Sequence, residues 1–243
     1  MTTVIPHKYR ELHERGLNKY LETGEGPVLG KKLELSALHK DGREFPIELS
    51  ITEAVRSEGK ARILSFIRDI SQEKLLQQMA AVQPMVIQAI EEAGTLQAAA
   101  ADVLDTIASR LGWSVAALWL IDSRRKVLRF ERMWHAEGID PVRFEETARA
   151  AEFKKEEGVP GRVWARGEPM WFEDFLSYED TPRVVTALRA GMRTVVALPI
   201  LQAGEVRGVV ELFASETRRE DRLVLNSLYE LGRLIGRAPL SQE

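Results

Sequence analysis

The chain of 243 residues contains no cysteine. This absence excludes disulfide bonds, thiolate metal ligands, cysteine nucleophiles and thioether-linked chromophores. The histidines His7, His39 and His135 are isolated in the sequence, without a second histidine or carboxylate at metal-ligand spacing, so we predict no metal site. No pair of nucleophile and base can be assembled either, and we therefore predict no catalytic residues and no enzymatic activity in this chain.

Long apolar runs are also missing. A membrane-spanning helix needs about 18 or more consecutive apolar residues, and the opening stretch MTTVIPHKYRELHERG lacks the apolar core of a signal peptide. The 34 basic residues are balanced by 37 acidic ones, so no basic surface for nucleic acid phosphates is expected. We expect a cytoplasmic protein that binds neither membranes nor nucleic acid.

The composition, 44% hydrophobic and 29% charged, is that of a soluble globular protein, and the length suits one full domain and a smaller one. In the smaller part, HKYRELHERGLNKYLETGEG has helical spacing and closes at Gly24. Three strands follow, with a turn at Asp41-Gly42 and an alternating face of Phe45, Ile47 and Leu49. The pattern predicts one helix and a three-stranded antiparallel meander.

From Ser71 onward the sequence predicts an amphipathic helix. Its apolar positions have the heptad spacing of a coiled coil; they are Leu75, Met79, Val82, Val86, Ala89 and Ala93. Two interpretations remain open: this stripe is the seam of a homodimer, or it packs against the chain's own domain. Because the stripe keeps its phase across Pro84, we expect a kink there and no full break.

The remaining segment has the pattern of one α+β domain with a central antiparallel sheet. It contains GVPGRVWARGEPMWFED, then RAGMRTVVALPILQAGEVRGVVELF, then an amphipathic terminal helix. With these motifs in this order, the stretch from Ala81 to Arg237 resembles a GAF domain. The resemblance implies an antiparallel sheet with a ligand pocket on one face and a helical layer, often a dimer contact, on the other. Gly158, Gly161 and Gly167 are predicted to form turns with positive φ.

By this resemblance, the strand face that carries Val115, Ala117, Trp119 and Ile121 points into the ligand pocket. Small-molecule pockets are mostly apolar with a few polar groups. The candidate ligand-binding residues are Ala117, Trp119, Trp134, Phe153, Trp164, Trp171 and Phe175. In the alternative interpretation, these rings fill the cavity as an ordinary core.

Several of the ligand classes known for the family can be excluded. Covalent bilins and the GAF-fold methionine sulfoxide reductases need cysteines, which this chain lacks. The cyclic nucleotide class carries an Asn-Lys signature that is absent beside FEDFLSYED. A small apolar or aromatic ligand, or no ligand, remains, and the cofactor is unknown.

Residues 5 to 70 resemble the second half of a PAS domain, through GLNKYLETGEGPVLGKKLELSALHKDGREFPIELSIT and SFIRDIS. Asp69 lies at the exit into a signalling helix, and the family's first strands and pocket helices are absent. His13 falls where haem-binding PAS sensors keep their proximal histidine. Haem binding is nevertheless not expected, because the walls of such a pocket are missing.

We therefore predict three segments: a partial PAS domain at 1–70, a signalling helix at 71–94 and a GAF domain at 95–243. This order resembles the sensory region of a bacterial histidine kinase, a homodimer whose output domain lies outside this chain. Asp69 and the heptad stripe would form its dimer and signalling helix. The alternatives are an effector-binding module of a transcription regulator or cyclic-dinucleotide enzyme, and a haem-type gas sensor.

Overall fold

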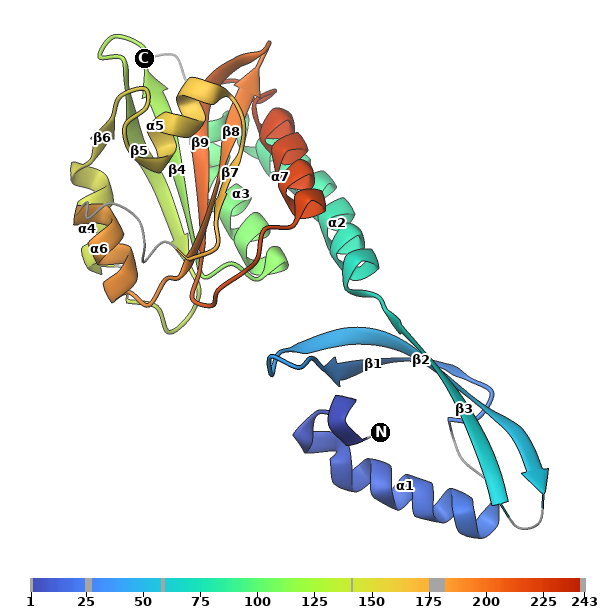
Figure 1. Cartoon of the computed structure of the whole chain (residues 1–243). Coiled ribbons are helices and arrows are strands. Elements are labelled where there is room, and N and C mark those ends of the chain that lie inside the picture. Colours follow the sequence, from blue (N-terminus) through green and yellow to red (C-terminus); the bar gives the residue numbers. More distant parts are fainter. Residues whose placement is uncertain (1, 25–27, 58–59, 141, 175–181, 241–243) are drawn as a thin grey trace. The chain divides into compact units, whose positions relative to one another are not determined.

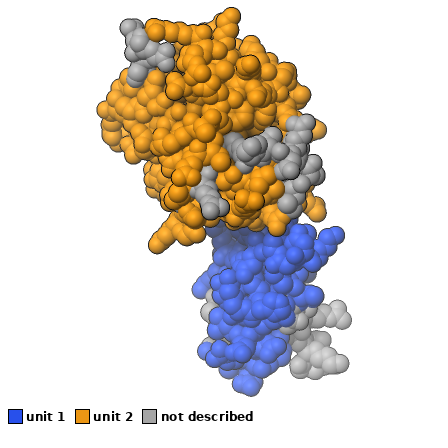
Figure 2. Space-filling view, turned by 90° about the vertical axis from the view of Figure 1, so that its left-hand side faces the viewer, with its two compact units in different colours: residues 1–76 blue, residues 77–243 orange. Residues whose placement is uncertain are grey.

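The computed structural model describes residues 2–24, 28–57, 60–140, 142–174 and 182–240 (Figure 1). The chain divides into two compact units, residues 1–76 and 77–243, which Figure 2 colours separately. The boundary falls inside one helix, α2 (Ser71–Ala93). Within the described part of the chain, no helix has both the length and the apolar character needed to cross a membrane.

The first unit is an antiparallel sheet of three strands with one α-helix. Two short 3-10 turns, Thr2–Val4 and His7–Tyr9, precede α1 (Arg10–Thr23), which ends at Gly24 in the left-handed conformation, with a φ of 72°. The strands are β1 (Lys32–Leu38), β2 (Glu44–Ser57) and β3 (Lys60–Asp69), and β2 lies between the other two. The predicted helix and meander are confirmed.

This first unit has a small core. The buried apolar side chains among its described residues are those of Pro6, Tyr20, Ala37, Ile47 and Ile70. Larger apolar side chains remain exposed, among them Leu12 at 65% and Phe66 at 62%. The first unit therefore has apolar surface that its own residues do not cover. Exposed apolar surface of this kind often marks a place where a protein contacts a partner.

The second unit is built on a six-stranded antiparallel sheet. Its spatial strand order is β6-β5-β4-β9-β8-β7. After α2, the elements are α3 (Leu96–Leu111), β4 (Val115–Asp122), β5 (Val127–His135), α4 (Val142–Ala150), β6 (Glu152–Phe153), α5 (Gly158–Arg166), β7 (Met170–Phe172), α6 (Pro182–Arg189), β8 (Thr194–Gln202), β9 (Glu205–Ala214) and α7 (Arg222–Ile235). The predicted α+β class is confirmed.

Helices cover both faces of this sheet (Figure 1). The α5 face is the one under α4, α5 and α6, and the α7 face is the one under α3 and α7, with α2 beside them. Side chains alternate along β4, so Trp119 points to the α5 face and Leu118 to the α7 face, and both are buried. The sequences of the central strands are therefore nearly continuous apolar runs, as is typical of strands that are covered on both faces.

Glycine allows α7 to pack closely on β8. A Cβ atom at Gly232 would lie 2.2 Å from the carbonyl oxygen of Pro199, well inside van der Waals contact. The spacing of this helix from the sheet is thus set by backbone, and any larger side chain at position 232 would push the two apart.

The α2 helix continues through Pro84 without a break. Its predicted dimer seam is, however, largely used within the chain, because Met79, Val82 and Val86 are 5%, 0% and 0% exposed. Burial of such a side chain contributes about 1.5–3 kcal/mol, so this face of α2 holds the helix to its own domain. The seam interpretation of these three residues is corrected in favour of the packing alternative.

Candidate functional site

A row of side chains crosses the α5 face at one register. It consists of Met133, Ala117, Glu211, Ala197 and Met170, on β5, β4, β9, β8 and β7. Glu211 lies at the centre of the row and is 2% exposed. An alanine on each side keeps the neighbouring positions small, so a carboxylate stands in the middle of an otherwise apolar surface.

Trp119 holds this carboxylate. Its indole Nε1 donates a hydrogen bond of 2.8 Å to Oε2 of Glu211, and the tryptophan side chain is fully buried. The ring meets Phe153 and Phe130 edge to face, at centroid distances of 5.0 and 5.7 Å. Because an unsatisfied buried carboxylate is strongly unfavourable, this bond helps to stabilise Glu211 inside the domain.

Apolar side chains from the covering helices pack above the row. Ala148 on α4, Val163 and Trp164 on α5 and Val159 at the start of α5 contact the cluster around Trp119. Two exposed cations lie over rings at its rim, Lys155 over Trp164 at 5.5 Å and Arg149 over Phe130 at 5.1 Å. The site is thus a buried aromatic and aliphatic surface with one carboxylate and a cationic rim.

Three glycines shape the two ends of α5 and its contact with the segment that precedes it. Gly158 and Gly167 have positive φ, 61° and 67°, as predicted. Gly161 does not, which corrects the prediction for that residue. It is required for a different reason, because a Cβ there would lie 2.1 Å from the carbonyl oxygen of Lys154.

The structure separates the predicted ligand-binding residues into two groups. Ala117, Trp119, Phe153 and Trp164 lie together on the α5 face. Trp134 and Trp171 do not: Trp134 is paired with Ala116, and Trp171 with Val196, and these positions belong to the α7 face. Phe175 lies outside the described residues.

Strand alternation explains why the prediction for Trp134 and Trp171 was wrong. Neighbouring residues of a strand point to opposite faces, so Met170 and Phe172 take the α5 face and Trp171 takes the other. On β5, the register shifts between Leu118 and Trp119 of the partner strand, which makes its phase difficult to predict from sequence.

Glu211 was missed by the sequence analysis. The available signal is one acidic residue inside the apolar run GVVELFA, which is unusual for a strand covered on both faces. Glu211 lies beside two alanines and contacts Trp119 because strands far apart in the sequence pair with each other. The sequence around Glu211 does not indicate these neighbours.

These observations can be set beside known proteins. The GAF domain profile matches residues 93–238. The chain belongs to the GAF domain family. Two proteins of known sequence match shorter segments: an uncharacterized protein of Azorhizobium caulinodans, 39% identical over 69 residues, and a probable serine/threonine-protein kinase of Dictyostelium discoideum, 37% identical over 73 residues. These segments are 28% and 30% of this chain, and the chain spans only 9% and 5% of the two proteins' length.

Solved structures share the GAF fold at low sequence identity. The GAF domain of a phosphoenolpyruvate-protein phosphotransferase from Coxiella burnetii has a TM-score of 0.54 and 17% identity, over 67% of this chain and 92% of that one. The A. aeolicus nlh2 GAF domain in an inactive state has a TM-score of 0.52 and 22% identity, over 67% and 96%. The free methionine-R-sulfoxide reductase of Neisseria meningitidis, in complex with its substrate, has a TM-score of 0.53 and 18% identity, over 65% and 86%.

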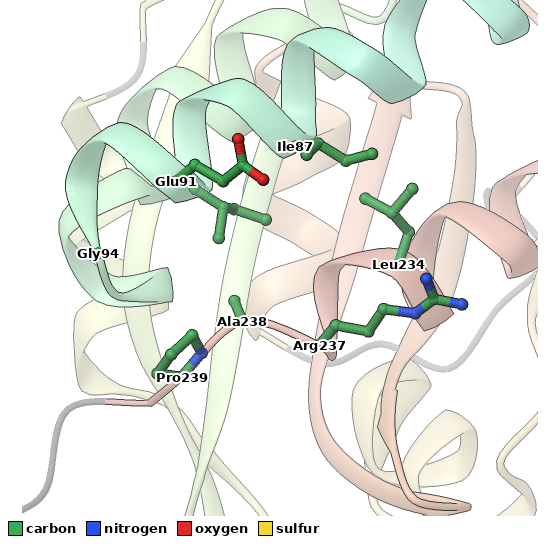
Figure 3. A pocket seen from close by; sticks show the side chains of 8 residues that line it. Ile87, Glu91, Gly94, Leu234, Arg237, Ala238 and Pro239 are labelled. Carbon is green, nitrogen blue, oxygen red and sulfur yellow. The ribbon is translucent and has the colours of Figure 1, made fainter.

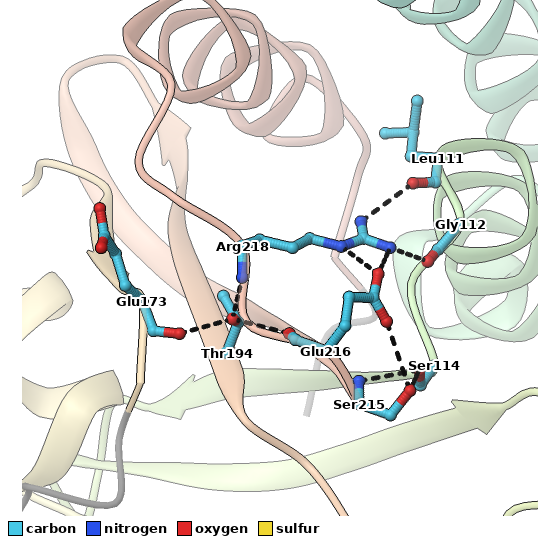
Figure 4. Close-up of polar contacts among 8 residues, drawn as sticks. All are labelled: Leu111, Gly112, Ser114, Glu173, Thr194, Ser215, Glu216 and Arg218. Atoms are coloured by element: carbon cyan, nitrogen blue, oxygen red, sulfur yellow. Dashed lines mark hydrogen bonds and ion pairs between the residues drawn. The ribbon is translucent and has the colours of Figure 1, made fainter. Parts of the chain in front are cut away.

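A polar network closes one end of the GAF domain sheet (Figure 4). The hydroxyl of Thr194, a fully buried residue, accepts a bond of 2.7 Å from the amide of Arg218. It also lies 2.7 and 3.0 Å from the carbonyl oxygens of Glu173 and Glu216, either of which can accept its proton. One hydroxyl therefore joins the end of β7, the start of β8 and the segment before α7.

Arg218 extends this network to Trp113 and Trp171. Its guanidinium lies 4.5 Å from the Trp113 ring, and its carbonyl oxygen accepts from Nε1 of Trp171 over 2.9 Å. The two indole rings meet edge to face at 6.0 Å. Trp171 thus has a structural role on the α7 face, opposite to the face that carries the row with Glu211 and its own neighbour Met170.

A groove of about 450 Å³ lies between α2 and the end of α7 (Figure 3). Its lining is Ile87, Ile90, Glu91, Gly94, Leu234, Arg237, Ala238 and Pro239. Ile87 is 40% exposed, although it follows the buried Val86 directly. The groove is therefore an apolar strip with one acidic and one basic side chain at its edge.

Two further predicted residues belong to the first unit. His13 lies on α1, and its Nδ1 is buried without a hydrogen-bond partner in the described part of the chain. Asp69 ends β3, and its Oδ1 accepts from both the amide and the hydroxyl of Ser71, over 2.8 and 2.6 Å. Asp69 therefore stabilises the first turn of α2 at the passage from strand to helix.

Proposed function

We propose that this GAF domain is the sensory part of a bacterial signal-transduction protein and binds a small molecule on its α5 face. GAF domains are common sensory modules of signalling proteins. The observation that carries the proposal is the buried pair of Glu211 and Trp119 at the centre of this face. A ligand that contacts it would have an apolar or aromatic body and one polar group.

Physical chemistry supports a ligand role for Glu211. A carboxylate costs free energy when it leaves water, and replacing buried charges by apolar groups is often neutral or stabilising. Fold stability alone therefore gives little reason for an acid between Ala117 and Ala197. In ligand pockets, by contrast, a few polar groups in an apolar lining orient the bound molecule.

Ligand binding is tested by native mass spectrometry of the full chain as purified, followed by denaturing chromatography to identify any released compound. Thermal unfolding with a panel of indole, tyramine and phenylacetate reports binding through the shift in Tm, because a ligand that binds the folded state stabilises it. We expect a shift in Tm with at least one compound, reduced in Glu211→Gln and retained in Trp134→Phe. No added mass and no shift with any compound would overturn the ligand proposal.

We propose further that the protein is a homodimer that relays signals through its helices, with a contact displaced by one residue from the predicted seam. Leu76, Ile87 and Ile90 each follow a residue of the original stripe and keep its heptad spacing. Leu76 and Ile87 are 43% and 40% exposed, and Ile87 and Ile90 line the groove beside Leu234. Two copies related by a two-fold axis would cover this strip.

Light scattering on the full chain over a range of concentrations tests the helical contact. Ile87→Asp is expected to weaken self-association, so that the larger species forms at a higher concentration than in the wild-type chain, while Ala81→Asp, on an exposed flank of the same helix, is the matched control. A strictly monomeric wild-type chain at high micromolar concentration, or equal behaviour of the two variants, would contradict a dimer through this strip.

The relay follows from this contact. If ligand binding favours one of two arrangements of the paired helices, the preference passes along α2, because a ligand shifts an equilibrium by its differential affinity for the two states. An output outside this chain, such as a histidine kinase, would respond to that shift, and we propose no enzymatic activity for the chain itself. The cytoplasm is the compartment that this role implies.

A further inference from the structure

The strand β3 is an edge strand with uncovered apolar side chains on both of its faces. It pairs with β2 along one side, and the strand order β1-β2-β3 leaves its other side at the edge of the sheet. Ile63, Leu64, Phe66 and Ile67 are 37%, 47%, 62% and 48% exposed. A long apolar edge of this kind is a template for pairing with another strand.

The sequence of this edge is symmetric. In Ile63-Leu64-Ser65-Phe66-Ile67, large apolar residues are placed equally on both sides of Ser65. If a second copy lies antiparallel with its Ser65 opposite Ser65, then Ile63 faces Ile67 and Leu64 faces Phe66. Residues directly opposite in an antiparallel pair point to the same face, so all four exposed side chains gain an apolar partner.

Ser65 itself provides an independent observation. Its Oγ is buried and has no hydrogen-bond partner among the described residues. A buried hydroxyl without a partner costs about 1–3 kcal/mol. Because a hydroxyl both donates and accepts, two Ser65 side chains that turn toward the shared edge can satisfy one another, as Ser and Thr pairs do across strands.

The charged flank of the strand tolerates this register. Arg68 would lie opposite Arg62 of the second copy, a pair of like charges. Arg68 already contacts two carboxylates of its own chain, Glu73 at 2.8 Å and Glu48 at 3.6 Å, which offset the repulsion. The other edge strand, β1, lacks such symmetry, since Lys32, Glu34 and Ser36 alternate with its apolar residues.

We propose that β3 pairs with β3 of a second copy of this chain, antiparallel and about a two-fold axis at Ser65. The two three-stranded sheets then form one continuous sheet of six strands. This contact covers the exposed edge of the first unit and is independent of the helical strip around Ile87.

A single-cysteine crosslink tests the register, since the chain contains no cysteine of its own. Opposite residues of an antiparallel pair have Cβ atoms about 4.5–5.5 Å apart, close to the separation of about 3.5–4.5 Å in a disulfide. At low micromolar concentration under mild oxidation, Ser65→Cys is expected to form a covalent dimer at least ten-fold faster than Ser36→Cys on β1.

Two further variants make the outcome decisive. Phe66→Lys in the Ser65→Cys chain should slow the crosslink to the Ser36→Cys rate, with far-UV circular dichroism unchanged because Phe66 is exposed. Ile87→Asp in the Ser65→Cys chain should leave the crosslink intact, which separates this contact from the helical one. Equal rates for Ser65→Cys and Ser36→Cys, or a crosslink that survives Phe66→Lys, would overturn the proposal.

Discussion

Trp119 and Glu211 are 92 residues apart in the sequence, yet the indole Nε1 of one donates to the carboxylate of the other over 2.8 Å. They are diagonal neighbours on β4 and β9, because Ala117 is the residue directly paired with Glu211 and Val209 the one paired with Trp119. The long tryptophan side chain spans this diagonal. A hydrogen bond thus crosses a face that is otherwise apolar, in the place where we propose that a ligand binds.

Trp119→Phe is expected to lower the free energy of unfolding by about 1–3 kcal/mol, because it removes a donor from a buried carboxylate. Urea unfolding followed by far-UV circular dichroism measures the loss. Trp134→Phe is the matched control, since Trp134 is half-buried on the opposite face and should cost less than about 1 kcal/mol. Equal losses in the two variants would show that ring volume matters and the hydrogen bond does not.

Thr194→Val is expected to destabilise the GAF domain by about 1–3 kcal/mol, because it leaves the amide of Arg218 and a carbonyl oxygen without their buried partner. Thr194→Ser keeps the hydroxyl and should cost clearly less. Tryptophan fluorescence during chemical unfolding provides the measurement, since Trp171 donates to the carbonyl of Arg218 in the same network. If the serine variant were as unstable as the valine variant, the hydroxyl would not be the cause.

Gly232→Ala should destabilise the domain by more than about 2 kcal/mol, because its Cβ would collide with the carbonyl oxygen of Pro199 and separate α7 from β8. Gly16→Ala is the opposite case: nothing lies within 4 Å of its Cβ position, in the middle of α1. Alanine there should stabilise the helix by about 0.5–1 kcal/mol. Thermal unfolding should show a lower Tm for Gly232→Ala and a higher Tm for Gly16→Ala. A Gly232→Ala chain as stable as the wild type would contradict the close packing of α7 on β8.

Asp69 makes the start of α2 sensitive to acid. The hydroxyl of Ser71, and then its amide, hold the pKa of the Asp69 carboxyl below its ordinary value of 3.8. Since the folded pKa is the lower one, the stabilisation is fully present above pH 3.8 and is lost as the pH falls through the folded pKa.

The measurement is hydrogen exchange of the Lys74 amide, which bonds to the carbonyl of Ile70 in the first turn of α2. At neutral pH, Asp69→Ala should weaken its protection by about 1 kcal/mol or less, because the carboxyl is largely exposed. Asp69→Asn should lose the pH dependence and retain part of the protection. If protection of the Lys74 amide in the wild-type chain stayed constant as the pH was lowered toward the folded pKa of Asp69, this account would be contradicted.

Much of the fold could be predicted from the sequence because it depends on local periodicity. Thr95 begins α3 with its side chain accepting from Ala98, and Gly112 ends it in the left-handed conformation, as their residue types indicate. The alternation of Phe45, Ile47 and Leu49 predicts a strand of the first unit, and the motifs around Gly158 and Gly191 identify the GAF domain. Each of these signals is complete within a few residues of the chain.

The candidate site could be predicted only in part. Trp119, Phe153 and Trp164 were expected on one face and lie there, but Trp134 and Trp171 lie on the other, because strand register and a bulge set the phase of each strand. Glu211 was not expected at all.

The sequence by itself determined most of the helices and strands and the heptad spacing of α2, since these follow from local spacing, and its motifs carry the resemblance of the larger unit to a GAF domain. The tertiary structure alone decided that Met79, Val82 and Val86 pack inside their own chain, and that Trp119 reaches Glu211. The sequence shows that an apolar stripe or a buried acid needs other side chains to contact. Which partner it finds depends on the pairing of strands and helices far apart in the sequence.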